Sequence, residues 1–447
     1  MPDLASPPAA LSLAEAKVPR YTSYPTAAQF GPLDEASYRR WLREGIGAAD
    51  PLSLYVHVPF CRALCWYCGC HTSVTRSEAR IAAYDAGLRA ELDLLAGALP
   101  PHGGVAHLHL GGGTPSMLGA ARLESLVASL RQRIGIRPGA ELAIELDPRL
   151  VDDALAESLA RSGFNRTSLG VQDISPTVQA AIGRVQPAEL VEAAMARLRR
   201  AGIAAVNIDL IYGLPHQTSA DVAASARFAA QIGASRVAVF GYAHVPWMKP
   251  HQRAIDDAAL PGAAARLEQA ATAEAVLRAE GYQAIGLDQF ARPADPLALA
   301  AREGRLRRNF QGYTTDAAPA LLGLGASAIG QLPGGLAQNL VDERAWPAAV
   351  REGRLPIARG RATTGADRLR WAAIERILCD LSLDAREPKL ASLLAQARPA
   401  LEPLRAAGVV ELDATSLRVT EPGRRFARLV AACFDAYLGT ARHSVAV

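Results

Sequence analysis

Four of the six cysteines in this 447-residue chain lie within ten residues, in the stretch CRALCWYCGC at 61–70. In a reducing compartment, clustered thiols bind metals or carry out redox chemistry more often than they form structural disulfides. The spacing Cys61-x3-Cys65-x2-Cys68 allows one loop to turn three sulfurs toward a single object. Three thiolates are the right number for an iron–sulfur cluster that keeps one iron open, and an open iron can bind a reactant.

Zinc is the alternative occupant of this loop, because four neighbouring thiolates can form a tetrahedral site. Structural zinc usually binds two well-separated pairs of cysteines, however, and these four are not so arranged. We expect Cys70 not to be a ligand. Only one residue separates it from Cys68, so the two sulfurs would be too crowded to bind the same cluster. Cys379 and Cys433 lie in apolar helical segments and are expected to be inert core thiols.

The elements that would position this loop are short β-rich runs separated by segments long enough for helices. Segments 80–99 and 188–202 show helical periodicity between them. Six such units predict a parallel α/β sheet, which periodicity alone leaves open between a partly closed barrel and a doubly wound sheet. In either case ligands gather at the carboxyl ends of the strands. The six runs are 52–58, 105–110, 141–146, 166–172, 205–211 and 236–242.

Several polar residues stand where these strands end. Glu145 closes the third run, Gln172 closes the fourth and Asp209 lies late in the fifth. Tyr55 and His57, two positions apart, share one face of the first strand just ahead of the cysteines. A carboxylate at a strand end is often only a helix cap or an ion-pair member, but several at one rim favour a binding site.

The stretch GGGTP at 111–115 follows the second run. It has neither the G-x-G-x-x-G pattern of dinucleotide-binding folds nor a nearby P-loop lysine. Its glycines would let the backbone approach a ligand closely, where any Cβ would intrude, although a tight turn is the alternative.

Together these motifs resemble the radical S-adenosylmethionine enzymes, whose signature is a C-x3-C-x2-C loop after a first strand, with an aromatic residue, here Tyr67, before the third cysteine. From about residue 19 to the C-terminus the chain resembles the oxygen-independent coproporphyrinogen III oxidase family. The motifs are PRYTSYPTA (19–27), SLYVHVPFC (53–61), the CGC ending of the cluster loop, GGGTP (111–115), NIDLIYGLP (207–215), YAHVP (242–246) and NFQGYTT (309–315).

The resemblance implies a partial (β/α)6 barrel, one [4Fe-4S] cluster on Cys61, Cys65 and Cys68, and two S-adenosylmethionine molecules. Each residue type at the family's S-adenosylmethionine contacts is matched, except that Tyr67 replaces a phenylalanine. These contacts are Tyr55, Tyr67, Gly112, Gly113, Thr114, Glu145, Gln172, Arg184, Asp209, Ala243 and Ile329.

The activity implied is the oxidative decarboxylation of two propionate side chains of coproporphyrinogen III to vinyl groups, giving protoporphyrinogen IX in haem biosynthesis. A 5′-deoxyadenosyl radical takes a hydrogen from the propionate β-carbon, and carbon dioxide and an electron are then lost. The cofactor supplies this chemistry, whereas the protein aims it and excludes competing reactants. His57 and Cys70 are candidate catalytic residues. The partners implied are a reductant such as flavodoxin or ferredoxin and an unidentified electron acceptor.

Two other functions stay open. The first is a haem-binding carrier of the same superfamily, although such relatives usually lack the fourth cysteine and the YTSYPTA segment that stand here at 70 and 21–27. The second is a zinc-stabilised regulator that uses a winged helix.

A substrate with four propionates should meet cationic side chains near the barrel mouth. The candidates are Arg20, Tyr21, Arg307, Arg308 and Gln311, although REGRLRR at 302–308 is also typical of a solvated basic helix face. The chain departs from the family pattern at Gln289, where a histidine is usual, and at Gly241, where an asparagine is usual. Gln289 can keep a hydrogen bond but cannot titrate.

Composition places the protein in a general class. A formal charge of +4, evenly spread, does not indicate nucleic-acid binding. The N-terminal 20 residues lack the basic start and unbroken apolar run of a secretory signal, and no apolar run approaches membrane-spanning length. We therefore expect a cytoplasmic protein without membrane attachment, and the family resemblance implies a monomer.

We expect five regions along the chain. Residues 1–18 form a disordered tail, 19–50 a covering segment, 51–250 the barrel and 251–360 a barrel extension with substrate-side elements. Residues 361–447 form a mainly helical, winged-helix-like domain with a two-stranded wing at 409–420. We expect that domain to cover the active-site side, because its basic residues are few.

Overall fold

A parallel sheet forms the centre of the molecule. The computed structural model describes residues 7–439 and 444–446, and the six expected strands are all present and adjacent in chain order, each parallel to the next. The fold is therefore α/β, as predicted. The strands are β2 (Leu52–Val58), β5 (Val105–Gly112), β6 (Ile136–Leu146), β7 (Arg166–Gln172), β8 (Ala205–Tyr212) and β9 (Arg236–Gly241).

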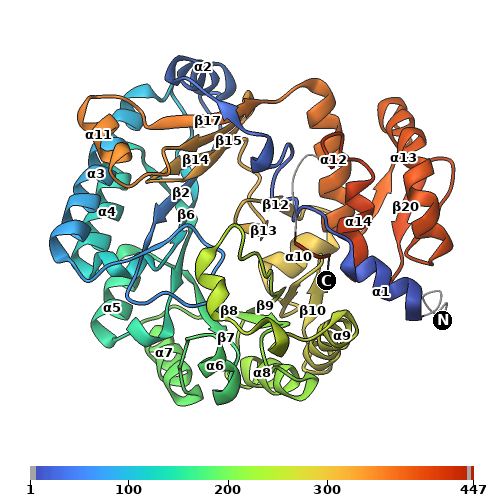
Figure 1. Cartoon of the computed structure of the whole chain (residues 1–447). Coiled ribbons are helices and arrows are strands. Elements are labelled where there is room, and N and C mark those ends of the chain that lie inside the picture. Colours follow the sequence, from blue (N-terminus) through green and yellow to red (C-terminus); the bar gives the residue numbers. More distant parts are fainter. Residues whose placement is uncertain (1–6, 440–443, 447) are drawn as a thin grey trace.

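Helices cover the outer face of this curved sheet, and Figure 1 shows them as an arc around the strands. They follow the strands in sequence, as βα units require. The expected helices at 80–99 and 188–202 are α3 (Glu78–Ala98) and α7 (Ala188–Arg200). The others in the arc are α4 (Ala120–Arg133), α5 (Asp153–Ser162), α6 (Pro176–Ala181), α8 (Ser219–Gln231) and α9 (Ala263–Ala279).

The inner face of the sheet is polar. In β7 and β8 every second residue is buried and the residues between are half-buried. Fully buried parallel strands usually read as continuous apolar runs. Here Leu169 and Ile208 belong to the apolar core, whereas Ser168 and Asp209 line a cavity. The barrel interior is consequently a hydrophilic space.

The sheet continues beyond the six strands but does not close. Next to β2 lies β14 (Ala320–Leu324), which is parallel to it. Strands β15 (Ile329–Leu332), β16 (Gly335–Asn339), β17 (Ile357–Ala362) and β1 (Gly31–Pro32) extend this side in antiparallel order. The other edge is formed by β11 (Gln289–Ala291) and β10 (Gln283–Ile285). The result is a partial barrel with two free edges.

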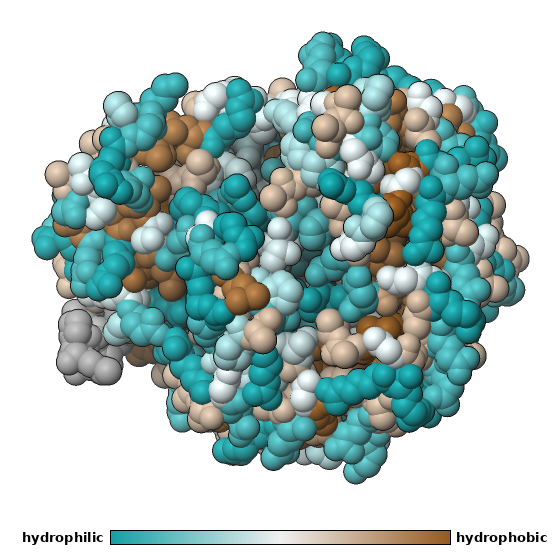
Figure 2. All heavy atoms as spheres, turned by 180° about the vertical axis from the view of Figure 1, so that it is seen from behind, coloured by the Kyte–Doolittle hydropathy of each residue, from teal (hydrophilic) through white to brown (hydrophobic). Residues whose placement is uncertain are grey.

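A separate hairpin, β12 (Arg307–Asn309) and β13 (Gly312–Thr314), lies between these two sides of the sheet (Figure 1). Seen from behind, the molecule is hollowed near its centre, and hydrophilic residues gather in the hollow (Figure 2). The remaining short elements are β3 (Phe60–Cys61), β4 (Ser73–Val74), α10 (Pro296–Arg302) and α11 (Ala345–Arg351).

The C-terminal domain contains α12 (Gly365–Asp380), α13 (Pro388–Ala406) and the short α14 (Ala427–Ala432). The two-stranded wing expected at 409–420 is present as the antiparallel pair β19 (Val410–Leu412) and β20 (Ser416–Val419), and a third strand, β18 (Ser382–Asp384), joins it along β20. Leu381 adopts φ +55 at the end of α12, and the chain then turns into β18. The expected boundary at 360/361 falls inside β17, so the domain begins at α12. The sheet order is β18, β20, β19.

The expected disordered tail at 1–18 is wrong for residues 7–18, and residues 1–6 lie outside the described residues. Helix α1 (Pro7–Glu15) contacts α9, Ala14 and Val18 are buried, and Lys17 pairs with Val445. Apolar burial against α9 orders this segment.

In the expected covering segment at 19–50, Arg20 and Ala28 border a cavity at the carboxyl ends of the strands. Helix α2 (Glu35–Gly45) instead packs Tyr38 and Trp41 into the core, against β15 and β17. Of the described helices, none combines the length and apolarity needed to cross a bilayer.

One buried carboxylate joins α3 to the extension of the sheet. Glu91 accepts hydrogen bonds from Gly325 N (2.8 Å), Trp346 Nε1 (2.9 Å) and Asn339 Nδ2 (2.6 Å). Burial raises the pKa of Glu91 to about 7. These bonds fix β14, β16 and α11 relative to α3.

We predict that Glu91→Ala lowers the free energy of unfolding by about 3 kcal/mol, because it leaves three buried donors without an acceptor. The matched control is Asp93→Ala, two residues after Glu91 in α3. It removes an exposed ion pair with Arg133 of α4 and should lower the free energy of unfolding by under about 1 kcal/mol. Urea unfolding of the two variants measures the difference. Equal effects would contradict the role given to Glu91.

Candidate active site at the carboxyl ends of the strands

A cavity of about 710 Å³ lies where the carboxyl ends of β5 to β9 meet the cysteine loop. This volume is within the usual range of small-molecule sites. Three of the expected cysteines and nine of the eleven expected S-adenosylmethionine contacts line it. These are Cys61, Cys65, Cys68, Tyr67, Gly112, Gly113, Thr114, Glu145, Gln172, Arg184, Asp209 and Ala243.

The three cysteine sulfurs each have a donor close by. Cys61 Sγ lies 3.1 Å from Thr72 Oγ1 and 3.4 Å from Thr114 Oγ1. Cys65 Sγ accepts from Arg184 Nη1 at 3.3 Å, and Cys68 Sγ accepts from the backbone N of Cys70 at 3.4 Å. Donors aimed at sulfur stabilise thiolate, which is the form that binds metal. At Cys61, however, burial outweighs the two hydroxyl contacts and raises the pKa of the thiol.

The contact between the Cys68 and Cys70 side chains shifts the pKa values of the two thiols in opposite directions. Hydrogen bonding to the Cys70 side chain, followed by its backbone N–H, lowers the pKa of Cys68 to about 6. The same side-chain contact raises the pKa of Cys70 well above its usual value. Cys70 is thus placed as a donor to Cys68. In the described part of the chain, no three His, Cys, Asp or Glu side chains are placed to hold a single metal ion.

The cysteine loop is held through its backbone by two distant segments. Trp66 N donates to Ile182 O at 3.0 Å. On the other side Gln252 Nε2 donates to Tyr67 O (2.9 Å), and Lys249 Nζ donates to Cys70 O (2.7 Å). These bonds restrain the backbone of the loop that carries the sulfurs.

Arg184 links the loop to the sheet. Its guanidinium is buried, bonds Cys65 Sγ and Gly170 O (2.7 Å), and lies 3.6 Å from Asp147 Oδ1. Asp147 also lines the cavity, and sequence reasoning missed it. Its position directly after β6, at the rim shared with Glu145, was the available signal.

The glycines of GGGTP are required by neighbouring protein atoms. Gly112 has φ +113, and a Cβ there would lie 2.6 Å from the His57 ring. A Cβ on Gly113 would lie 2.7 Å from Phe60 O. The loop packs directly on β2 and β3, and Gly112 and Gly113 also line the main cavity, so close packing within the protein is one reason for these glycines.

Tyr55 and Ile329 line a second cavity of about 330 Å³, together with His57, His71 and Gln311. Tyr55 Oη lies 3.0 Å from His57 Nδ1, and His57 Nε2 lies 2.9 Å from His71 O. Burial lowers the pKa of His57 to about 4, so the ring is neutral at pH 7 and both nitrogens are engaged. His57 positions Tyr55 in this geometry.

Glu145 belongs to both cavities. Burial alone would raise the pKa of Glu145, but hydrogen bonds from His109 (3.1 Å) and Gly112 N (3.1 Å) hold it below its usual value. The residue therefore presents a carboxylate where the two spaces meet.

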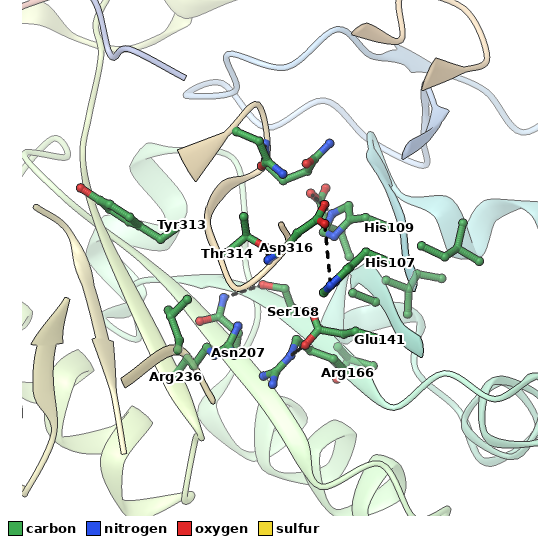
Figure 3. Close-up of a pocket in the computed structure, with 18 of the residues that line it drawn as sticks. His107, His109, Glu141, Arg166, Ser168, Asn207, Arg236, Tyr313, Thr314 and Asp316 are labelled. Carbon is green, nitrogen blue, oxygen red and sulfur yellow. Dashed lines mark hydrogen bonds and ion pairs between the residues drawn. The ribbon is translucent and has the colours of Figure 1, made fainter. Parts of the chain in front are cut away.

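A third, smaller cavity of about 220 Å³ is lined by residues of β5 to β9 and of the β12–β13 hairpin. Figure 3 shows its polar side chains pointing toward one another, among them Arg166 bonded to Glu141 (3.0 Å). Asp209, which this space shares with the main cavity, accepts from Ser168 Oγ (2.8 Å) and Asn207 Nδ2 (2.7 Å). Burial raises the pKa of Asp209 to about 6.

Two of the five substrate candidates lie at the site. Arg20 lines the main cavity and donates to Gly241 O at 2.9 Å. Gln311 lines both the second and third cavities, and its buried Nε2 has no hydrogen-bond partner among the described residues. Gln289 lines the third cavity and Gly241 the main one.

The other three candidates, Tyr21, Arg307 and Arg308, do not line any of these three cavities. Tyr21 is buried and donates to Asp435 Oδ2 at 3.0 Å. Arg308 is buried and donates to the carbonyl of Tyr21 (3.0 Å), and Arg307 pairs with Glu375 at 3.2 Å. These side chains connect the hairpin and the covering segment to the C-terminal domain, which sequence spacing could not show.

The remaining thiols behave as expected. Cys379 is buried, and burial raises its pKa to about 12, while burial raises the pKa of Cys433 to about 11. Neither thiol carries the thiolate character that metal binding requires.

Comparison with known proteins places this site in a family. The family model described as the radical SAM superfamily matches residues 55–229. The oxygen-independent coproporphyrinogen III oxidase of Bradyrhizobium diazoefficiens is 47% identical over 446 residues, which is 98% of this chain and 99% of that protein. The Escherichia coli protein of the same name is 39% identical over 431 residues, covering 94% of this chain and 93% of that one.

The solved structure of Escherichia coli coproporphyrinogen III oxidase, described as a radical SAM enzyme, superposes with a TM-score of 0.89. It shares 39% sequence identity, and the match covers 94% of this chain and 98% of that one. Because the similarity extends over nearly the whole length at this identity, the chain belongs to the oxygen-independent coproporphyrinogen III oxidase family of radical SAM enzymes.

Proposed function

We propose that this protein converts two propionate side chains of coproporphyrinogen III to vinyl groups without oxygen, giving protoporphyrinogen IX for haem biosynthesis. Family membership and the names of the relatives support the reaction. The observation that carries it is the single cavity that joins Cys61, Cys65 and Cys68 to the polar rim of the sheet.

The donor set fits a [4Fe-4S] cluster. The three sulfurs of the loop border one cavity, and Cys65 and Cys68 accept hydrogen bonds that favour thiolate. When bound, the cluster and S-adenosylmethionine supply a one-electron cleavage of a carbon–sulfur bond that begins hydrogen abstraction. In this proposal Cys61, Cys65 and Cys68 hold the cluster.

The remaining site residues orient the cofactor and the substrate. The carboxylate of Glu145 faces both cavities, where it can meet a cationic amino group. Tyr55 and Ile329 line the second cavity, and Arg184 and Asp209 the main one, which agrees with two S-adenosylmethionine molecules. The unpaired amide of Gln311 is free to donate to a substrate carboxylate.

The N-terminal segment borders this space. Val18, Pro19, Arg20 and Ala28 line the main cavity together with Ser444 from the opposite end of the chain. A reactive radical needs such enclosure, because water and stray hydrogen donors compete with the substrate.

A haem-binding carrier is not favoured, because Cys70 and the YTSYPTA segment at 21–27 are both present. The zinc regulator is not favoured either, since the family is one of radical SAM enzymes. We propose in addition a flavodoxin- or ferredoxin-like reductant, a separate electron acceptor, a monomeric state and a cytoplasmic location. The free thiols of all six cysteines agree with a reducing compartment.

The direct test is anaerobic turnover of the reconstituted protein with coproporphyrinogen III, S-adenosylmethionine and dithionite. We expect protoporphyrinogen IX, detected after oxidation by porphyrin fluorescence, together with release of two carbon dioxide molecules for each substrate. Haem binding without any vinyl product would contradict the proposal and support the carrier.

The cysteine assignment has its own test. We predict that Cys61→Ala, Cys65→Ala or Cys68→Ala each abolishes the visible absorbance of the cluster, because each removes one of three ligands. Cys70→Ala, the matched control nine residues after Cys61, should keep iron and sulfide content but lower turnover. A full cluster in Cys65→Ala would refute the ligand set.

A further inference from the structure

A buried glutamine lies directly behind Arg184. The two residues belong to the loop at 182–187, between α6 and α7. Gln186 is 1% exposed, whereas Val185 between them is 63% exposed, so the loop turns Arg184 and Gln186 inward on either side of an outward residue. Arg184 lines the main cavity, and Gln186 does not. A buried amide needs donors and acceptors inside the protein, and its partners show what it holds in place.

The first partner of Gln186 is the guanidinium of Arg184. Gln186 Oε1 accepts from Arg184 Nε at 3.2 Å. The other two nitrogens are those already described, with Nη1 donating to Cys65 Sγ and Nη2 donating to Gly170 O. Each nitrogen of the guanidinium therefore has a protein partner. Because the group is planar, the bond to Nε helps to set the direction in which the other two nitrogens point.

The second partner is the end of strand β7. Gln186 Nε2 donates to the carbonyl oxygens of Gly170 (3.2 Å) and Val171. The pairing of β7 with β8 shifts register between Gly170 and Gln172, so Val171 has no partner in β8. Gln172 follows with φ +69 and lines the main cavity. Bulges of this kind redirect side chains next to binding sites, and the amide of Gln186 holds the carbonyls of this one.

A second buried amide holds the backbone of Gln186. Gln179 of α6 is 3% exposed, and its Oε1 accepts from Gln186 N at 2.9 Å. Gln179 Nε2 donates to Gln186 O (2.8 Å) and to Asp173 O (2.9 Å). Both backbone groups of Gln186 are thus bonded, which restrains the position from which its side chain reaches Arg184.

We propose that Gln186 is a positioning residue for S-adenosylmethionine binding, which orients Arg184 and the Gln172 end of β7 and supports the hydrogen bond from Arg184 to Cys65. The inference rests on the proposed function, in which Arg184 and Gln172 contact S-adenosylmethionine and Cys65 holds the cluster. Gln186 acts through these residues, because it does not line the cavity itself.

The test uses Gln186→Met in the anaerobically reconstituted protein, because methionine keeps the length of the side chain but loses the amide. We expect the dissociation constant of S-adenosylmethionine to rise about tenfold or more, since Arg184 is no longer oriented. We also expect the midpoint potential of the cluster, titrated without S-adenosylmethionine, to fall. A hydrogen bond to a ligand sulfur favours the reduced, more negative cluster, and the bond to Cys65 weakens in this variant.

The matched control is Gln269→Met in α9. Gln269 is also 1% exposed, its Oε1 accepts from Gly213 N at 2.9 Å and its Nε2 donates to Gln217 O at 2.7 Å. The control therefore loses buried amide bonds of the same kind, but Gln269 does not bond to Arg184. We expect its affinity for S-adenosylmethionine to stay within about twofold and its midpoint potential to be unchanged. Iron and sulfide content is measured for each variant.

Two further variants separate positioning from a general effect on folding. In Arg184→Met/Gln186→Met, the midpoint potential should equal that of Arg184→Met alone, because Gln186 acts on the cluster through Arg184. Gln186→Glu keeps an acceptor for Arg184 Nε, and its affinity for S-adenosylmethionine should stay within about threefold of the unaltered protein. This last measurement decides the question if Gln186→Met does not assemble a cluster.

The proposal is overturned if Gln186→Met matches Gln269→Met in either cofactor affinity or midpoint potential. It is also overturned if the double variant has a lower potential than Arg184→Met, or if Gln186→Glu loses affinity tenfold. Failure of the proposed function is distinct from these results, since it appears as absent vinyl product in the unaltered protein.

Discussion

The site depends on hydrogen bonds that hold one short loop from outside. Backbone groups of Trp66, Tyr67 and Cys70 bond to the segments near 182 and 250, so the protein itself restrains the loop that carries the sulfurs of Cys61, Cys65 and Cys68. Such preorganisation keeps the geometry of a metal site from resting on the metal alone. The position of the loop on the rim of a parallel sheet then decides which side chains share its cavity.

A second feature follows from the partial closure of the barrel. The inner face of the sheet carries half-buried polar residues, and three connected spaces open along it. Glu145 lines all three of them, and its carboxylate is kept ionised by His109 and Gly112. Because the Glu145 carboxylate borders all three cavities, it can interact with a ligand in more than one of them. The hairpin that carries Gln311 contributes a buried amide nitrogen that has no hydrogen-bond partner among the described residues.

Much of this architecture could be predicted from sequence, because local patterns encode it. All six strands and the helices at 80–99 and 188–202 were recognisable from alternation and periodicity. The residues at strand ends, such as Glu145 and Asp209, could be placed at one rim because parallel strands share an edge. Arg184 came from the family resemblance, since nothing in its own spacing indicates a bond to Cys65.

The errors concern long-range contacts, which sequence patterns do not encode. Arg308 of the hairpin donates to the carbonyl of Tyr21, and Tyr21 donates to Asp435, so these two side chains connect the hairpin and the N-terminal segment to the C-terminal domain. The tail at 7–18 is ordered by packing on α9, and β18, which was not predicted, pairs with the distant strand β20. In each case the contact that decides the structure is made with a residue far away in the sequence.

The most direct test of the account is electron paramagnetic resonance of the reduced, reconstituted protein with and without S-adenosylmethionine. If three cysteines leave one iron open, the account predicts that the cofactor binds that iron and shifts the cluster signal. A spectrum that the cofactor leaves unchanged would show a fully ligated cluster and would contradict the central claim.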